Sequence, residues 1–191
     1  MSYTTRKMGL QELKTIYRKI EQDFREGEYP PYDKLYKQLE DGIQNGTVLM
    51  EDSRDVAYSI CAEGKNGYVL VSLLAVYDAF RGKGHGSAFL EILKSVYRDK
   101  NGIIVEVERP EDAEDGREKA VREKRLAFYQ KAGFRIIPGI EYSIWDIPMH
   151  LMVFPLNSDI TEINDHIGQI IYEIYLGLMG KRFIHKMVFR R

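Results

Sequence analysis

Cysteine and tryptophan are nearly missing from this sequence, which contains one of each, Cys61 and Trp145. A single cysteine excludes an internal disulfide and cannot build a thiolate metal site, so we expect Cys61 to be a small core residue. The four histidines show no spacing typical of paired metal ligands, and no Gly-x-Ser-x-Gly segment predicts a serine nucleophile. We therefore expect no metal site.

An excess of charge of one sign is also missing. The 28 Lys and Arg residues balance 29 Asp and Glu residues, which leaves a net charge of −1 and no overall field to attract nucleic acid or a membrane. No apolar run is long enough to span a bilayer, and the first residues lack the apolar segment of a signal peptide. We expect a cytoplasmic protein with no nucleic acid and no membrane among its partners.

The most informative stretch runs from Gly67 to Lys100 and reads as strand, glycine-rich turn and helix. Residues 69–77 form a nearly continuous apolar run, which is typical of a strand buried on both faces. The end of the stretch places apolar residues on one helical stripe, namely Ala88, Phe89, Ile92, Leu93, Val96 and Tyr97. The segment RGKGHG at residues 81–86 separates the two.

This turn has the composition of a phosphate-binding loop. The start of a helix leaves backbone N–H groups without partners inside the helix, and the helix dipole favours an anion there. Three glycines, Gly82, Gly84 and Gly86, remove the side chains that would keep an anion from those groups. Arg81 and Lys83 add positive charge. The alternative is a tight turn that needs glycine only for its backbone angles.

Two other phosphate-binding folds fit the turn poorly. The phosphate loop of nucleotide hydrolases requires Ser or Thr after its lysine, whereas Lys83 is followed by Gly84. The dinucleotide-binding fingerprint would have Ser87 at its third glycine position, although Glu106 could imitate the ribose-binding acid of that fold. Four residues, 78–81, also separate the apolar run from the glycines, where the dinucleotide fold has almost none.

Three segments of the chain, taken together, resemble the signatures of one family. They are RGKGHG, with Arg81, Gly84 and Gly86 at the defining positions, then VEVE at residues 105–108, then FYQKAGF at residues 128–134. The first is similar to the Arg/Gln-x-x-Gly-x-Gly/Ala signature of the GCN5-related N-acetyltransferases (GNAT), and the third to their Tyr-x-x-x-Gly-Phe segment. The resemblance implies an α/β GNAT fold, in which a central mixed and mostly antiparallel sheet is flanked by helices.

In the resembled family this turn binds the pyrophosphate of acetyl-CoA. The resemblance therefore implies acetyl-CoA as the cosubstrate, held at Arg81, Gly82, Lys83, Gly84, His85, Gly86 and Ser87. It also implies that backbone N–H groups at Leu74, Ala75 and Val76 polarise the thioester carbonyl and hold the pantetheine arm. The implied activity is acetyl transfer to a primary amine of a small molecule or a peptide. The alternative is a non-enzymatic CoA-binding sensor or scaffold.

Three residues are candidates for the catalytic groups. By resemblance, Tyr129 matches the family's usual proton donor to the departing thiolate, and Glu106 matches the glutamate base of some members. Glu108 is the reserve base, because strand alternation puts it on the same side as Glu106. The alternatives are an ordinary packing tyrosine and a solvated carboxylate at a strand end. Arg122 stands where the family often has an asparagine, seven residues before the tyrosine.

Periodicity and turn residues predict further elements. The segment before the central strand should hold an edge strand at residues 2–8 and helices at residues 10–24 and 32–43, the second ended by Asn45-Gly46. The segment after it should hold a helix with a solvated basic face at residues 117–125 and a loop from Pro138 that carries Trp145 and Pro148.

Tyrosines gather in the predicted N-terminal helical region. Tyr29, Tyr32 and Tyr36 lie where the resembled family forms part of its acceptor pocket, so they could line a substrate slot. A tyrosine-rich packing surface explains them at least as well.

The chain is expected to divide at Pro155. Residues 1–155 would form the GNAT domain, and residues 156–191 a C-terminal helix and basic tail. Apolar residues from Ile160 to Leu178 recur at helical spacing. This stripe either packs on the chain's own core or pairs with a second copy, which would make a homodimer.

Overall fold

The structure, a computed structural model, describes residues 2–191. These residues form two compact units. The first reaches Glu63 and includes Val71–Leu93, and the second consists of Gly64–Leu70 and Lys94–Arg191. One strand, β4 (Tyr68–Val76), contributes residues to both units.

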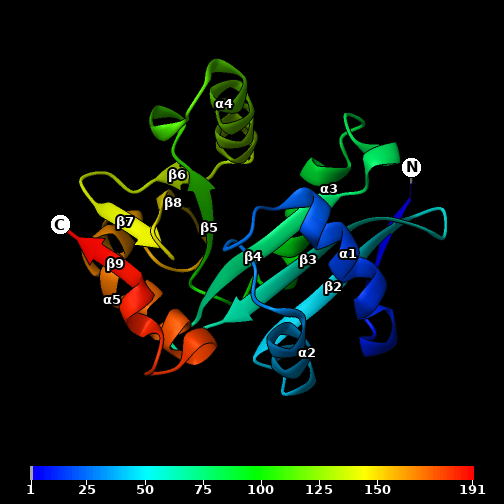
Figure 1. Ribbon diagram of the computed structural model, residues 1–191, viewed down its shortest axis with the longest axis horizontal. Helices are drawn as coiled ribbons and strands as arrows, with labels where there is room; N and C mark the ends of the chain where they lie inside the picture. Colours follow the sequence, from blue (N-terminus) through cyan, green and yellow to red (C-terminus); the bar gives the residue numbers. More distant parts are fainter. Residues whose placement is uncertain (1) are drawn as a thin grey trace. The chain divides into compact units, whose positions relative to one another are not determined.

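The first unit contains a sheet in the order β1-β2-β3-β4 (Figure 1). Its other strands are β1 (Tyr3–Lys7), β2 (Gln44–Glu51) and β3 (Arg54–Glu63). The predicted edge strand is confirmed as β1, which pairs antiparallel with β2. Asp52 and Ser53 join β2 to β3 with φ angles of 47° and 64°, because a two-residue hairpin turn needs positive φ at both positions.

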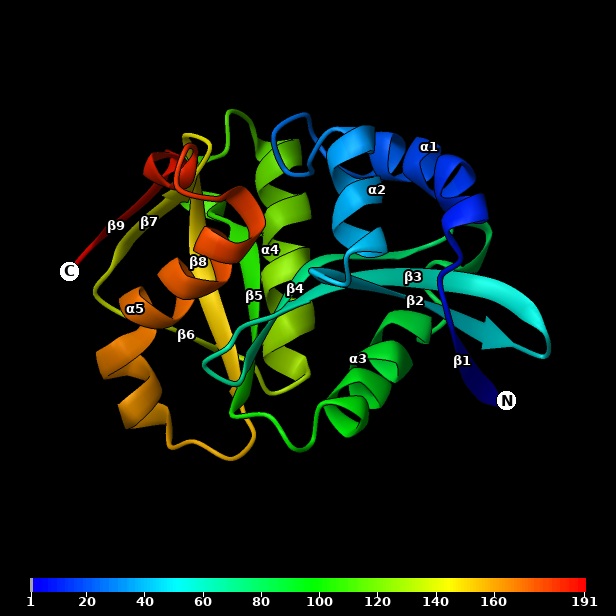
Figure 2. The same ribbon diagram turned by 90° about the horizontal axis from the view of Figure 1, so that it is seen from below.

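Helices cover both faces of this first sheet (Figure 2). α1 (Leu13–Asp23), which follows a 3₁₀ turn at Leu10–Glu12, and α2 (Tyr32–Glu40) lie on one face, and α3 (His85–Val96) lies on the other. The core under α1 and α2 contains Met8, Leu13, Ile16, Ile20, Leu35, Val48, Tyr58, Ile60, Leu73 and Ala75. Partly buried tyrosines pack against this core, among them Tyr29, Tyr32 and Tyr36.

The predicted stop of the second helix at Asn45-Gly46 was wrong. α2 ends at Glu40, and both residues lie in β2, where they pair with Cys61 and Ile60. The chain turns at Gly42, whose φ of 69° is one that glycine adopts without strain. Pairing with β3 thus overrides the turn tendency of the Asn-Gly pair.

The second unit is built on β5 (Gly102–Glu108) and β8 (Ile147–Pro155), which pair antiparallel along the whole of β5. β4 and β5 pair in parallel from Tyr68 opposite Gly102 to Leu70 opposite Ile104. β8 also pairs with β6 (Arg135–Ile136) and β7 (Glu141–Ile144), and β7 pairs with β9 (Met187–Arg190). One parallel ladder among antiparallel ones confirms the predicted mixed, mostly antiparallel sheet.

Two helices belong to the second unit. α4 (Gly116–Lys131), preceded by a 3₁₀ turn at Pro110–Asp112, is capped by the Asp115 carboxylate, which accepts from the Glu118 N–H. α5 (Ile160–Met179) is capped by Asp159. Most of the predicted stripe of α5 is buried, at Ile163, Ile167, Ile170, Ile171, Ile174 and Tyr175, while its end residues Ile160 and Leu178 are partly exposed. It therefore packs on its own chain, in the same unit as β5 and α4.

The predicted loop around Trp145 was wrong, because this segment is the hairpin of β7 and β8 and Pro148 lies inside β8. Trp145 and Asp146 form its turn with φ angles of 51° and 66°. Sequence gave no sign of it, since such turns usually contain glycine or asparagine. Tertiary contacts hold the turn instead: the Trp145 N–H donates to the Lys186 carbonyl at 2.9 Å, and its ring centroid lies 5.9 Å from that of Phe183.

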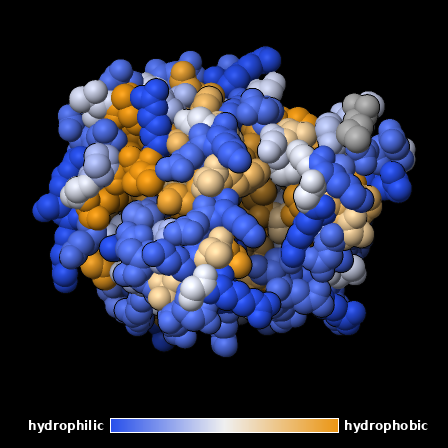
Figure 3. Space-filling view, turned by 90° about the horizontal axis from the view of Figure 1, so that it is seen from above, coloured by the Kyte–Doolittle hydropathy of each residue, from blue (hydrophilic) through white to orange (hydrophobic). Residues whose placement is uncertain are grey.

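On the face drawn in Figure 3, hydrophilic residues predominate and apolar residues are visible between them. Within residues 2–191, no helix is both long enough and apolar enough to cross a bilayer.

Candidate active site

The glycine-rich turn of the first unit has the backbone that an anion site needs. Gly82 and Gly84 have φ angles of 76° and 88°, which residues with a Cβ rarely adopt. A Cβ built at either glycine would meet no atom within 4 Å. The missing side chains therefore leave open space beside the backbone.

Helix α3 begins directly after this turn. Its first internal hydrogen bond joins the Ala88 N–H to the Gly84 carbonyl at 3.0 Å. The N–H groups before Ala88, including those of Gly86 and Ser87, belong to the first turn, where a helix has no carbonyl to offer them. Open space, a helix start and glycine backbone together form a cradle that fits a phosphate group.

The side chain of Arg81 holds the turn in place through contacts with other protein groups. Its guanidinium forms ion pairs with Asp23 of α1 and, at 2.7 Å, with Asp78. Its Nε also donates to the carbonyl of Val76 at 3.0 Å, and Asp23 accepts from the Tyr58 hydroxyl at 3.2 Å. The side chain thus fastens the turn to α1 and to the end of β4.

The side chains of Lys83 and His85 also contact other protein groups. The Lys83 ammonium donates to the carbonyl of Ala79 at 3.0 Å. His85 is only 2% exposed, and its Nδ1 lies 3.0 Å from the Tyr3 hydroxyl, while Nε2 lies 3.9 Å from the Glu51 carboxylate. At this position the backbone of His85, not its ring, is available to an anion.

The end of β4 presents alternate residues to two environments. Leu73 and Ala75 are buried in the core under α1 and α2, whereas Leu74 and Val76 are partly exposed. This segment leads through a 3₁₀ turn at Asp78–Phe80 into the glycine-rich turn. The residues expected to hold a pantetheine arm are therefore close in sequence and in space to the phosphate cradle.

Glu106 of the second unit has two tyrosine partners. One carboxylate oxygen accepts from the Tyr142 hydroxyl, and the other accepts from the Tyr175 hydroxyl at 2.7 Å. Tyr142 lies on β7 and Tyr175 on α5, and both are buried. Burial is the main cause that raises the pKa of each phenol well above its ordinary value, and the charge of Glu106 adds to it.

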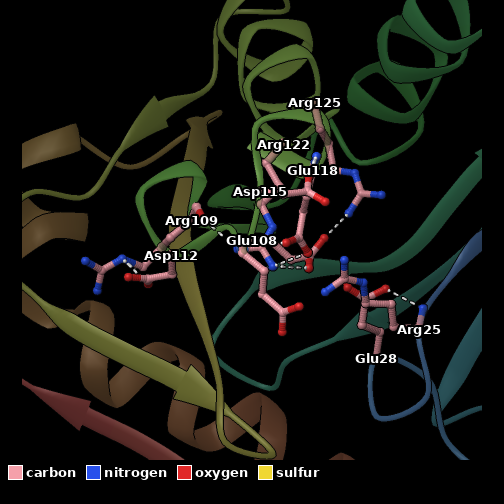
Figure 4. A network of polar contacts seen from close by, with 10 residues as sticks. Arg25, Glu28, Glu108, Arg109, Asp112, Asp115, Glu118, Arg122 and Arg125 are labelled. Atoms are coloured by element: carbon pink, nitrogen blue, oxygen red, sulfur yellow. Dashed lines mark hydrogen bonds and ion pairs between the residues drawn. The ribbon is translucent and has the colours of Figure 1, made fainter. Parts of the chain in front are cut away.

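Glu108 lies two residues further along β5 and has different partners (Figure 4). Arg122 and Arg125 of α4 approach one oxygen each, at 3.1 Å and 3.0 Å. Arg122 also pairs with Glu118 at 2.9 Å and donates to the Arg109 carbonyl at 2.8 Å. Glu108 is only 6% exposed, so its charge is balanced by arginines and not by solvent.

The solvated basic face predicted for α4 was therefore wrong at Arg122, which is 7% exposed. The charge pattern of the helix suggested a surface role because neither Glu108 nor Arg109 is near Arg122 in sequence. Only the packing of α4 on β5 brings a buried carboxylate to it.

Tyr129 is buried at the C-terminal end of α4, with 8% of its surface exposed. Its ring meets Phe128 and Phe134 edge to face, with centroids 5.0 Å and 5.6 Å away. Its backbone carbonyl accepts from the Phe134 N–H at 3.0 Å, which fixes the Gly133-Phe134 corner. These contacts hold the phenol in one orientation.

Neither Tyr142 nor Tyr175 was predicted from the sequence as a residue of the site. Tyr175 had a weak signal: its hydroxyl gives it a polar tip within an otherwise apolar helical stripe. Tyr142 had none, because its strand was read as a loop. In the part of the chain that the structure describes, no group of three or more His, Cys, Asp or Glu could hold a metal ion.

Comparisons with known proteins agree with this architecture. Residues 44–136 match the sequence model of the acetyltransferase (GNAT) domain. A protein from Bacteroides thetaiotaomicron assigned to the GNAT acetyltransferases has a similar structure, with a TM-score of 0.74 and 23% identity over 91% of this chain and 98% of that one. No curated protein matches by sequence.

Two further solved structures are similar at lower identity. The ribosomal-protein-S18-alanine N-acetyltransferase of Escherichia coli has a TM-score of 0.59 and 19% identity, over 83% of this chain and 96% of that one. A dodecameric spermidine N-acetyltransferase of Vibrio cholerae has a TM-score of 0.61 and 12% identity, over 81% and 94%. At these identities the likeness concerns the fold alone.

Proposed function

We propose that this chain, whose residues 44–136 match the model of the acetyltransferase (GNAT) domain, is a GNAT acetyltransferase that moves an acetyl group from acetyl-CoA to a primary amine. The turn before α3 carries this proposal: Gly82 and Gly84 have positive φ and leave open space at the start of a helix. The pyrophosphate of CoA is an anion of the kind that such a helix start binds.

The backbone of the turn would hold the phosphates, through N–H groups of residues 82–87. Arg81 would act mainly by shaping the turn, since its guanidinium bonds Asp23, Asp78 and Val76. We assign the backbone of Leu74, Ala75 and Val76 to the pantetheine arm and to the thioester carbonyl. When bound, acetyl-CoA supplies a carbonyl carbon that an amine nitrogen can attack.

Two side chains of the second unit would move the protons. An amine that enters as ammonium must lose a proton before its nitrogen can form the new C–N bond, and we assign this proton to Glu106. As the C–S bond breaks, Tyr129 would give its hydroxyl proton to the sulfur. The second proton lost by the acetylated nitrogen then replaces the one that Tyr129 gave, so the protons balance.

We do not assign the role of the base to Glu108. Both of its oxygens already face arginines, and the residue is 6% exposed, so an incoming amine has little access to it. Its position on β5 favours a part in holding α4 against the strand. Glu106 is the better candidate base because it is only partly buried.

The acceptor is proposed only as a class, a small-molecule or peptide amine. The Escherichia coli structure is named for an alanine of ribosomal protein S18, and the Vibrio cholerae structure for spermidine. These names span both kinds of amine. The formation of a homodimer also stays a prediction.

Thiol release from acetyl-CoA across a panel of amines tests the proposal. The panel should contain polyamines, amino sugars, peptide N-termini and lysine side chains. We expect one class to give turnover well above the rate without amine. CoA binding in calorimetry without turnover on any amine would favour the sensor or scaffold. Absence of CoA binding would overturn the cofactor assignment.

A further inference from the structure

The cluster of Glu106, Tyr142 and Tyr175 joins three segments that lie far apart in the sequence. Tyr142 is 36 residues and Tyr175 is 69 residues from Glu106. Tyr175 belongs to α5, which follows residues 44–136, the part of the chain that matches the GNAT domain model. The C-terminal segment therefore contributes a hydroxyl to the candidate base.

The hydroxyls of Tyr142 and Tyr175 are suited to act as lasting hydrogen-bond donors to the Glu106 carboxylate. Tyr142 is 2% and Tyr175 is 9% exposed, so solvent cannot easily replace either hydroxyl. Burial first, and then the charge of Glu106, raises the pKa of both phenols well above the ordinary value. They consequently stay protonated at any pH at which an amine would be acetylated.

The position of Tyr175 is fixed along α5. Asp159 caps the helix by accepting from the Thr161 N–H at 2.7 Å. The Asn66 amide donates to the carbonyl of Ile170 at 3.1 Å and to the Glu173 carboxylate at 3.0 Å, which ties the turn before β4 to the helix. With its apolar stripe buried, α5 can neither slide nor rotate without losing these contacts.

We propose that Tyr175 and Tyr142 are positioning residues that hold the carboxylate plane of Glu106 for proton transfer. This inference rests on the proposed function, because it takes Glu106 as the proton acceptor. The neighbouring charge on the same strand, Glu108, is balanced by Arg122 and Arg125.

The test compares Tyr175→Phe and Tyr142→Phe with Tyr172→Phe in the full chain. Tyr172 lies on the same helix but is 40% exposed, which makes it a matched control. We expect each cluster variant to lower kcat by about ten-fold, since a misplaced base loses alignment, with little change in CoA affinity. The ascending limb of the pH–rate profile should move to higher pH, because each hydroxyl stabilises the charged carboxylate.

A double-mutant cycle with Glu106→Gln tests whether Tyr175 affects kcat through Glu106. If Tyr175 acts through Glu106, then Tyr175→Phe should change kcat by less than about two-fold in the Glu106→Gln background. An equal loss in both backgrounds, or no loss in the wild type, would overturn the inference. Should Tyr175→Phe fail to fold, Tyr142→Phe gives the same cycle.

Failure of the proposed acetyl transfer can be distinguished from failure of the positioning role. If no amine yields turnover in the wild type, the acetyl-transfer proposal fails first. Urea unfolding of the wild type, Tyr175→Phe, Glu106→Gln and the double variant then still measures the coupling between residues 175 and 106. A coupling free energy of zero would overturn the positioning role as well. A coupling free energy clearly different from zero would support the contact between Tyr175 and Glu106 without acetyl transfer as its purpose.

Discussion

At the scale of single residues, Gly84 combines a positive φ with open space beside its Cα. Its φ of 88° excludes most residues, and the space where a Cβ would lie is open. A turn that needed glycine for close packing would have protein atoms there. The open space leaves room for a ligand, and the positive φ also suits a turn that needs glycine for its backbone angles.

Gly84→Asp should abolish CoA binding while the protein stays folded. The new carboxylate would occupy the open space and repel phosphate oxygens. Gly42→Asp is the matched control, because Gly42 has a φ of 69° and open space but lies away from the turn. Both variants should lose about 1 kcal/mol of stability from the strained φ. Calorimetry and circular dichroism measure the outcome; unchanged CoA affinity in a folded Gly84→Asp protein would refute the cofactor site.

Tyr129→Phe removes a hydroxyl and keeps the ring that packs between Phe128 and Phe134. If this hydroxyl protonates the leaving sulfur, turnover should fall by roughly ten- to a thousand-fold with little change in acetyl-CoA affinity. Steady-state kinetics at saturating substrates decides the point. Equal turnover of the two proteins would leave Tyr129 as a packing residue.

At the scale of elements, ion pairs join helices to strands within each unit. In the second unit, Glu108 attaches β5 to α4 through Arg122 and Arg125. In the first unit, Glu12 accepts two hydrogen bonds from Arg6 of β1, at 2.6 Å and 2.7 Å, and one from the Gly9 N–H. This carboxylate joins β1 to the start of α1.

The contribution of Glu12 to stability should depend on pH. Its hydrogen bonds with Arg6 lower its pKa, so its stabilisation is complete above the ordinary glutamate pKa and is lost as pH falls through the lowered value. Glu12→Gln should therefore cost about 1 kcal/mol at pH 7 and almost nothing near pH 2. Urea unfolding at both pH values, with the exposed Glu21→Gln as control, measures this. A cost that is the same at both pH values would contradict the assignment.

At the scale of the whole molecule, the C-terminal segment belongs to the compact unit that contains β5 and α4. It supplies α5, the edge strand β9 and the phenol of Tyr175. The predicted boundary at Pro155 therefore separates two stretches of sequence that share one core in the structure. We infer that the segment is required for folding of this unit.

A chain that ends at Leu156 should lose stability and aggregate. It would expose the apolar surface that the stripe of α5 covers, including the contacts of Ile163, Ile167 and Ile171, which are fully buried. Light scattering and thermal unfolding of both chains measure the effect. A soluble monomer from a full-length dimer would instead assign the segment to pairing. A truncated chain of unchanged mass and stability would contradict both roles.

Sequence alone determined most of the element order and the position of the glycine-rich turn. Helix starts, strand alternation and glycine angles depend on neighbours within a few residues, so their signals lie along the chain. Gly82 and Gly84, the strand with Glu106 and the stripe of α5 could be read for this reason. The β7–β8 hairpin could not, because contacts with Lys186 and Phe183 hold its turn.

Only the tertiary structure decided the environment of each candidate catalytic residue. Strand alternation alone does not distinguish Glu106 from Glu108, which lie two residues apart on one strand. The structure gives one of them two buried phenols and the other two arginines. These partners come from other elements of the fold, up to 69 residues away, and no local preference specifies them. The packing of α4, β7 and α5 around β5 decides which partners each carboxylate has.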